Sequence, residues 1–178
     1  MGGMVAIRAA LKAPERFRSL ILMDTAAHGI TLFEPKIQAQ LNELVTREGC
    51  QALLSGMQAQ PQSPVVQRGI DFLGAAEHWR RIRVKLEQMD PQAFVDLGRE
   101  LSTQTSVLDK LHTISMPTTI LVGEDDVPFI NPSKTMASAI DDAELVKIPN
   151  ARHSPQYENA DIWRDALLSH LDRTKARS

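Results

Sequence analysis

The sequence is poor in the residues that mark specialised protein classes. Cys50 is the only cysteine among 178 residues, so the chain can form neither an intramolecular disulfide nor a cysteine-rich metal site. We expect Cys50 to pack as a small hydrophobic residue, and a single free cysteine suits a reducing, cytoplasmic location. The five histidines are scattered without the spacing of zinc sites, which predicts no metal: His28, His78, His112, His153 and His170.

Neither a dominant charge nor a long apolar run is present. The 20 basic and 22 acidic side chains give a formal net charge of -2, which gives no electrostatic reason to expect nucleic acid or an anionic membrane as partner. No stretch approaches about 20 apolar residues, and the N-terminus lacks the basic and apolar segments of a signal peptide. Hydrophobic residues make up 43% of the chain, so we expect an ordinary globular protein with one sizeable core.

Three short apolar runs predict the strands of a buried parallel sheet. They span residues 18–24, 118–122 and 143–148. Helical spacing of apolar residues at 4–13 and 132–140 places one helix before the first strand and another between the last two. Adjacent parallel strands require such a crossover. The pattern therefore predicts an α/β fold with helices flanking the sheet.

The middle of the chain, residues 28–105, is polar and helical, with several proline and glycine breaks. About 75 residues between two buried strands is far longer than an ordinary connection in an α/β fold. We interpret this segment as a helical cap or lid, and residues 1–27 with 106–178 as the core. Amphipathic helices are expected within the cap, over residues 37–47, 51–57, 66–89 and 92–101.

Carboxylates and a histidine follow two of the predicted strands, where each strand ends. Gly123, Glu124, Asp125 and Asp126 come directly after the second strand, and His153 follows the third. Open α/β sheets bind ligands beside the carboxyl ends of their strands, and neighbouring strands lie about 4.8 Å apart. A carboxylate on one ring nitrogen fixes the tautomer of a histidine and leaves the other nitrogen to take a proton. The pattern favours an acid–base pair over a merely solvated turn.

These segments resemble the α/β hydrolase superfamily across nearly the whole chain. Residues 17–26 are similar to the family's sixth strand, 121–126 to its seventh strand and acid turn, and 151–155 to its histidine loop. The resemblance implies the C-terminal part of an α/β hydrolase fold, with three parallel strands, flanking helices and a helical cap insertion. It implies no cofactor.

The resemblance also gives the site residues their roles. The family's spacing of a glycine, two residues and an aspartate points to Asp126 as the acid, with Asp125 in reserve. Asp24, at the end of the first strand, is an acid candidate that fits the family pattern less well. His153 becomes the base that serves a serine.

A last helix is expected after Glu158 and Asn159, which resemble the family's Glu-Asn turn. Asn159 or Asp161 can cap this helix. Its apolar side chains predict the face that packs against the sheet: Ile162, Trp163, Ala166, Leu167 and Leu171.

The beginning of the sequence resembles the end of the family's nucleophile elbow, Gly-x-Ser-x-Gly, which needs small residues around an exposed serine. Met1-Gly2-Gly3-Met4 matches the part after the serine, so the resemblance places the nucleophile directly before Met1. The backbone N–H of Met1 would then form part of the oxyanion hole. No serine of this chain lies between glycines at elbow spacing. We therefore expect a fragment that is inactive alone.

The implied parent enzyme is a capped hydrolase that cleaves a small ester, lactone or related substrate by Ser-His-Asp acyl transfer. Caps in this family form the wall over the substrate. Trp79, Phe33, Phe72 and Met57 are therefore the predicted lining for an apolar acyl or alkyl group. Packing between cap helices is the alternative role of these four side chains.

A second interpretation is a short α/β protein without catalysis that acts as a binding or interaction module. In either interpretation the first strand would present an unpaired edge, at which the chain could associate with a second copy. The presence of both the acid turn and the histidine favours the hydrolase, because a binding module has no need of both.

Overall fold

The computed structural model describes residues 1–62 and 64–176. The chain divides into two compact units, Met1–Gly29 with Thr105–Ser178, and Ile30–Gln104. These divisions lie within two residues of the predicted boundaries between core and cap. That the second unit serves as a lid stays a prediction.

The first unit is built on a parallel sheet of three strands, in the order β1-β2-β3. The strands are β1 (Leu20–Met23), β2 (Thr118–Gly123) and β3 (Ala143–Ile148). All six residues of β2 are buried, as expected of a central strand that is covered on both faces. The predicted α/β fold class, with three parallel strands and flanking helices, is confirmed.

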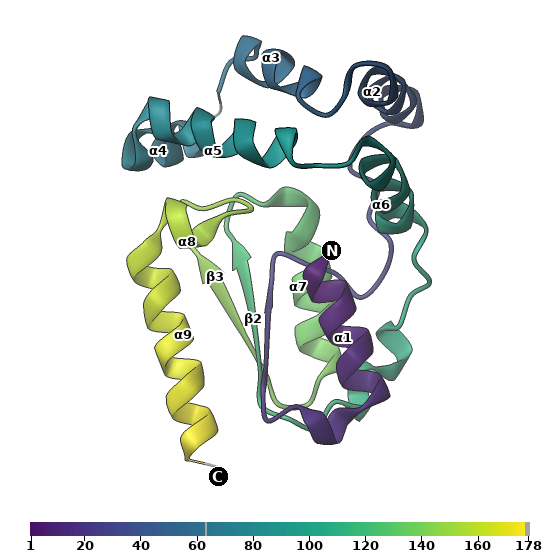
Figure 1. Cartoon of the computed structure of the whole chain (residues 1–178). Coiled ribbons are helices and arrows are strands. Elements are labelled where there is room, and N and C mark those ends of the chain that lie inside the picture. The colour runs from purple at the N-terminus through teal and green to yellow at the C-terminus, as the bar shows by residue number, and fades with distance from the viewer. Residues whose placement is uncertain (63, 177–178) are drawn as a thin grey trace. The chain divides into compact units, whose positions relative to one another are not determined.

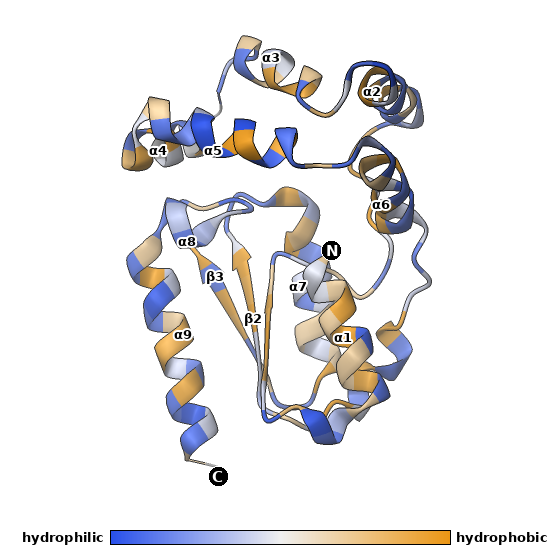
Figure 2. Cartoon of the chain, viewed as in Figure 1, coloured by the Kyte–Doolittle hydropathy of each residue, from blue (hydrophilic) through white to orange (hydrophobic). Residues whose placement is uncertain are grey.

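Helices cover both faces of this sheet (Figure 1). The helices of this unit are α1 (Gly2–Lys12), η1 (Pro14–Arg16), η2 (Leu108–Thr113), α7 (Val127–Ala139), α8 (Pro155–Glu158) and α9 (Ala160–Lys175). The helices α1 and α7 lie on one face of the sheet, and α9 lies on the other (Figure 1). Figure 2 shows α1 as largely hydrophobic, whereas hydrophilic and hydrophobic residues alternate along α9. One hydrophobic core joins the first face to its helices, with members that include Ile7, Ala10, Leu22, Leu111, Ile120, Met136 and Ile140.

The crossover helix between β2 and β3 begins earlier than its sequence pattern indicated. A start at Pro132 was expected, but α7 runs from Val127 to Ala139 with Pro132 inside it. A proline lacks the N–H that would bond to the carbonyl four residues earlier. Pro132 is the sixth residue of α7, beyond the first four N–H groups that lack such partners in any helix, so α7 contains it at the loss of one intrahelical hydrogen bond. The early start matters for the site, because it places Asp126 at the helix N-cap position.

The predicted packed face of the last helix is partly wrong. Ile162 and Leu171 of α9 are 41% and 43% exposed, whereas His170 is buried. His170 Nδ1 lies 2.8 Å from Thr119 Oγ1 of β2. This polar contact joins residues far apart in the sequence and places His170 against the sheet. Ile162 and Leu171 of the predicted apolar face are therefore exposed to solvent.

The second unit consists of helices only among its described residues. They are α2 (Pro35–Glu48), α3 (Ala52–Ala59), α4 (Pro64–Leu73), α5 (Ala75–Glu87) and α6 (Pro91–Thr103). The single helix expected over residues 66–89 is wrong, because the chain breaks at Gly74, where φ is +79°. A backbone in this left-handed region interrupts a right-handed helix. Cys50 is buried in a small core with Val45 and Leu86, so its predicted packing role is confirmed.

None of the helices in the described residues is both long enough and apolar enough to cross a bilayer.

Candidate active site

The turn after β2 directs one of its three carboxylates inward. Asp126 is 4% exposed, whereas Glu124 and Asp125 are exposed. Backbone hydrogen bonds hold the turn against the end of β3: Glu124 N–H donates to Ile148 O at 2.9 Å, and Asp125 N–H donates to Ala151 O at 2.9 Å. The side chain of Asp126 therefore leaves the turn at a fixed place beside the loop that follows β3.

That loop carries His153 and is held by the Glu-Asn pair noted in the sequence. Glu158 Oε2 accepts hydrogen bonds from the backbone N–H groups on either side of the histidine, from Arg152 at 2.7 Å and from Ser154 at 3.2 Å. The Asn159 side chain donates to the Pro149 carbonyl at 2.8 Å. Asn159 occupies the N-cap position of α9, yet no cap bond from its side chain forms. The expected capping role is therefore replaced by one in the histidine loop.

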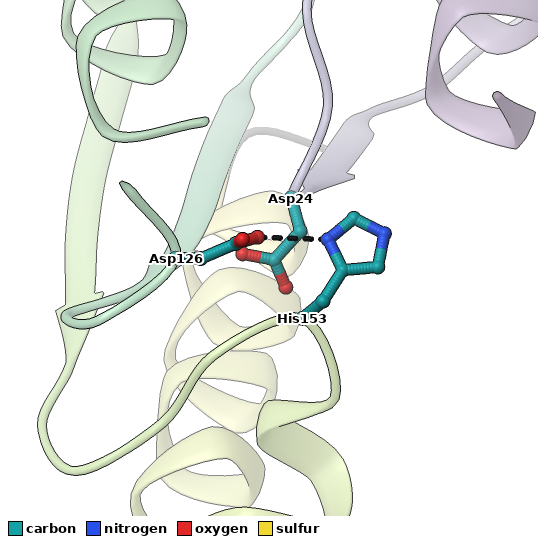
Figure 3. Close-up of side chains that lie close together, drawn as sticks. All are labelled: Asp24, Asp126 and His153. Atoms are coloured by element: carbon teal, nitrogen blue, oxygen red, sulfur yellow. Dashed lines mark hydrogen bonds and ion pairs between the residues drawn. The ribbon is translucent and has the colours of Figure 1, made fainter. Parts of the chain in front are cut away.

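His153 and Asp126 meet directly (Figure 3). Their Nδ1 and Oδ2 atoms are 2.7 Å apart. The Asp126 side chain is 5% exposed and that of His153 is 59% exposed. The second ring nitrogen, Nε2, points away from Asp126 (Figure 3). The pair therefore joins a buried carboxylate to an imidazole whose other nitrogen can be reached.

Two neighbours set the properties of this imidazole. The hydrogen bond to Asp126 raises the pKa of His153 above its ordinary value of 6.5, because the carboxylate favours the charged ring. The ring of Phe129 in α7 lies with its centroid 4.9 Å from that of His153, tilted by 36°. Phe129 is 5% exposed, so it gives the imidazole a fixed apolar wall.

A third side chain reaches the pair from β1. Asp24 follows the last residue of that strand, with φ at +44°, and is 4% exposed. Its Oδ1 accepts a hydrogen bond from the Gly123 N–H at 2.9 Å. Burial, together with the nearby Asp126 carboxyl, raises the pKa of Asp24 to about 7. Figure 3 shows its carboxyl group beside that of Asp126.

Asp24, Asp126 and His153 are all side chains of the kinds that can bind a metal ion. One ligand atom from each of Asp24, Asp126 and His153 lies within 4.8 Å of the others. However, the Nδ1 of His153 and the Oδ2 of Asp126 are already bonded to each other, and an ion held by both atoms would have to break that bond. We therefore assign no metal to the cluster.

The residues that resemble the end of a nucleophile elbow lie beside the same site. Met1 precedes α1, which starts at the carboxyl ends of the strands (Figure 1). Burial lowers the pKa of its amino group, whose charge in turn lowers the pKa of His153. A Cβ at Gly3 would lie 2.5 Å from the Cγ2 of Thr25, so this position has no room for a side chain. The oxyanion role of Met1 stays a prediction.

The four predicted lining residues belong to the second unit and lie on separate segments of it. Phe33 precedes α2, Met57 belongs to α3, Phe72 to α4 and Trp79 to α5. Phe33, Met57 and Phe72 are 45%, 44% and 64% exposed. Trp79 packs edge-on against His78, with ring centroids 4.9 Å apart. Their contact with a substrate stays a prediction.

Sequence reasoning missed two residues at this site. Phe129 carried no signal beyond its place in a helical pattern. The sequence pattern indicates Asp24 only as an alternative acid, not as a neighbour of Asp126. The available signal was its position at the end of a buried strand, since strand ends of one parallel sheet meet along one edge.

Comparisons with known proteins agree with this architecture. Residues 1–160 match the family described as alpha/beta hydrolase fold. The chain is 27% identical to a 2-hydroxy-6-oxononadienedioate/2-hydroxy-6-oxononatrienedioate hydrolase of Pseudomonas sp., over 97% of this chain and 61% of that protein. It is 26% identical to a pimeloyl-(acyl-carrier protein) methyl ester esterase of Nitrosospira multiformis, over 87% of this chain and 59% of that protein.

A solved structure gives the same result in three dimensions. A thermophilic esterase from Thermogutta terrifontis superimposes with a TM-score of 0.75 at 26% identity, over 97% of this chain and 62% of the esterase. The chain thus spans about three fifths of the length of the relatives described. Both curated relatives are named as hydrolytic enzymes, one a hydrolase and the other a methyl ester esterase. The fold, the match over residues 1–160 and these relatives together show that the chain belongs to the α/β hydrolase family.

Proposed function

We propose that this chain supplies the acid and the base of a serine hydrolase that cleaves a small ester, lactone or related substrate. The observation that carries the proposal is the 2.7 Å contact between His153 Nδ1 and Asp126 Oδ2. With its Nδ1 proton donated to a carboxylate, the imidazole keeps the lone pair of Nε2 available for a proton. Nε2 is the nitrogen that points away from Asp126 (Figure 3).

In the proposed reaction, His153 Nε2 takes the proton of a serine hydroxyl as the serine oxygen attacks the substrate carbonyl. Asp126 stays ionised and stabilises the imidazolium that forms. The imidazolium then gives its proton to the leaving alcohol, and an acyl-enzyme remains. A water molecule, activated by the same imidazole, releases the acid and restores the serine. The N–H of Met1 would donate to the oxyanion in both halves of the reaction.

The serine itself would come from the residue directly before Met1. The close contact between Gly3 and Thr25 supports this assignment, because an elbow requires small residues after its nucleophile. The lengths of the relatives agree with it, since they extend well beyond the region that this chain matches. The chain alone would then be a fragment without turnover.

The proposed substrate is a small molecule with an apolar acyl or alkyl group. Phe33, Phe72, Met57 and Trp79 are the side chains proposed to contact that group, since apolar and aromatic residues line such pockets. One relative is named as a methyl ester esterase, which fits the ester class. We propose a cytoplasmic location, in agreement with the single cysteine, which is buried.

A binding module without catalysis is favoured less by the geometry. Recognition does not require a buried carboxylate that holds an exposed imidazole in one tautomer. The edge of β1 is relevant to either function, because β1 pairs only with β2 among the described residues. We propose this edge as the place where further strands of a longer chain, or a second copy, would pair.

The coding DNA and ester turnover test the proposal together. We expect the codons directly before Met1 to encode Gly-x-Ser in frame, and the longer polypeptide to hydrolyse p-nitrophenyl butyrate steadily. The 178-residue chain should show no turnover above background, since loss of a triad nucleophile costs about 10⁶-fold in kcat. A stop codon directly before Met1 would contradict the proposal. So would steady turnover by the 178-residue chain that His153→Ala abolishes.

A further inference from the structure

A buried carboxyl oxygen beside the candidate site has no partner. Asp24 is 4% exposed, and its Oδ1 accepts the Gly123 N–H. Its Oδ2 is buried and has no hydrogen-bond partner among the residues that the structure describes. An ionised carboxylate that is buried with a single donor is poorly compensated for its lost hydration. The acid–base mechanism above does not use this group.

The nearest carboxyl group in the cluster belongs to Asp126, which is equally buried. Two carboxylates that share a buried site cannot both be ionised at neutral pH without a large electrostatic cost, so one of them holds a proton. Asp126 accepts the Nδ1 proton of His153 and is stabilised as the anion by that bond. Asp24 faces only one backbone donor, so the proton belongs on Asp24.

We propose that Asp24 is a positioning residue, whose neutral carboxyl group donates a hydrogen bond from Oδ2 to the Asp126 carboxylate and fixes it toward His153. This inference rests on the His153–Asp126 pairing of the proposed function and extends it by one residue. The proton on Oδ2 gives the orphaned oxygen a partner and removes the repulsion between the two carboxyl groups.

A carboxyl oxygen of Asp24 lies within 4.8 Å of one of Asp126, and the backbone holds Asp24 in this place. Its N–H donates to the Leu121 carbonyl at 3.0 Å, and its side chain accepts from Gly123 two residues further along β2. The residue is thus fixed to the neighbouring strand through both its main chain and its side chain. Its φ of +44° lies in the left-handed region, which asparagine also tolerates well. Asp24→Asn is therefore a conservative variant that keeps an acceptor for Gly123 and a donor for Asp126.

The charged groups around this cluster determine the shape of the His153 titration curve. Asp24 lies at the end of β1, Asp126 in the turn after β2, and His153 in the loop after β3. The amino group of Met1 lies at the start of α1. The Lys147–Glu124 pair, 3.6 Å apart, is exposed on the outer side of the turn. As Asp24 loses its proton, its charge raises the pKa of His153. The two groups therefore titrate as a coupled pair.

NMR titration of the 178-residue chain with isotope-labelled histidine tests the proposal. In the wild type we expect His153 to titrate in a broad, two-step curve that extends to high pH. In Asp24→Asn we expect a single step with a lower midpoint, and in Asp126→Asn a midpoint lower still. Asp125→Asn, at the exposed neighbour of Asp126, is the matched control and should leave the wild-type curve unchanged.

Two results would overturn the inference, and they can be told apart. Identical His153 curves in the wild type and in Asp24→Asn, together with the same pH dependence of stability in these two proteins and a lower midpoint in Asp126→Asn, would leave the His153–Asp126 pair standing and reduce Asp24 to a structural residue. An unchanged His153 midpoint in Asp126→Asn would remove the pair itself, and with it the proposed function.

Stability against pH gives a second readout. The pKa of Asp24 is about 7 in the folded chain against 3.8 ordinarily, so the folded state holds this proton more tightly than the unfolded state. The wild type should therefore lose stability as the pH rises from about 4 to about 7. The raised pKa of His153 acts in the same direction, and its contribution is smaller in Asp24→Asn, which lacks the charge of Asp24. The urea midpoint of the wild type should fall relative to that of Asp24→Asn over this range; a constant difference would contradict a proton on Asp24.

Discussion

Asp126→Asn is expected to lower kcat by about 10⁴-fold in the polypeptide that supplies the serine. An asparagine can donate its amide N–H to Nδ1, which places the imidazole proton on Nε2 and removes the lone pair that the serine needs. The substrate does not touch this carboxyl group, so KM should change little. Steady-state kinetics with p-nitrophenyl butyrate measures both constants.

Asp125→Asn provides the matched control for this experiment. The two aspartates are adjacent in the turn, but the side chain of Asp125 is exposed whereas that of Asp126 faces His153. We expect Asp125→Asn to change kcat by less than about threefold. A large loss in Asp125→Asn together with a small loss in Asp126→Asn would move the acid to Asp125.

Gly123→Ala is expected to lower the free energy of unfolding by about 3 kcal/mol or more. A Cβ at this position would meet the carbonyl oxygens of Arg152 and Ala151, the second at 2.5 Å. These are backbone atoms of the histidine loop and cannot turn aside as a flexible side chain can. The loop would have to move away from the end of β2, and His153 would move with it. Urea denaturation of the 178-residue chain measures the loss.

Gly2→Ala is the control for the glycine substitution. A Cβ at Gly2 meets nothing within 4 Å, and its position at the start of α1 accepts alanine readily. We expect a change of less than about 0.5 kcal/mol in the free energy of unfolding. If Gly123→Ala proved as mild as Gly2→Ala, the histidine loop would not be packed against β2 as the structure has it.

The elements of the sheet could be predicted from the sequence because their signals are local. β1, β2 and β3 are short apolar runs bounded by turn residues, and the turns after β2 and β3 carry the carboxylates and the histidine. Adjacent strand ends then predicted that Asp126 and His153 would lie close together, and the structure has them 2.7 Å apart. Their catalytic roles remain a proposal.

The features that could not be predicted from the sequence depend on contacts between distant parts of the chain. The outward turn of Leu171 in α9 depends on the contact between His170 and Thr119, which are 51 residues apart. The place of Asp24 beside Asp126 depends on the pairing of β1 with β2, in which Met23 lies opposite Leu121. The sequence shows that Asp24 ends a buried strand, but it does not show the register of β1 against β2, because the apolar pattern of a buried strand is nearly continuous.

Labelling with a fluorophosphonate tests most directly whether His153 activates a serine. Such reagents react with serines that are made nucleophilic by a neighbouring base, and peptide mapping locates the adduct. In the polypeptide that includes the residues before Met1, we predict one adduct, on the serine directly before Met1, and its loss in His153→Ala. An adduct on a serine within residues 1–178, or labelling that persists unchanged in His153→Ala, would contradict the assignment of His153 as the base.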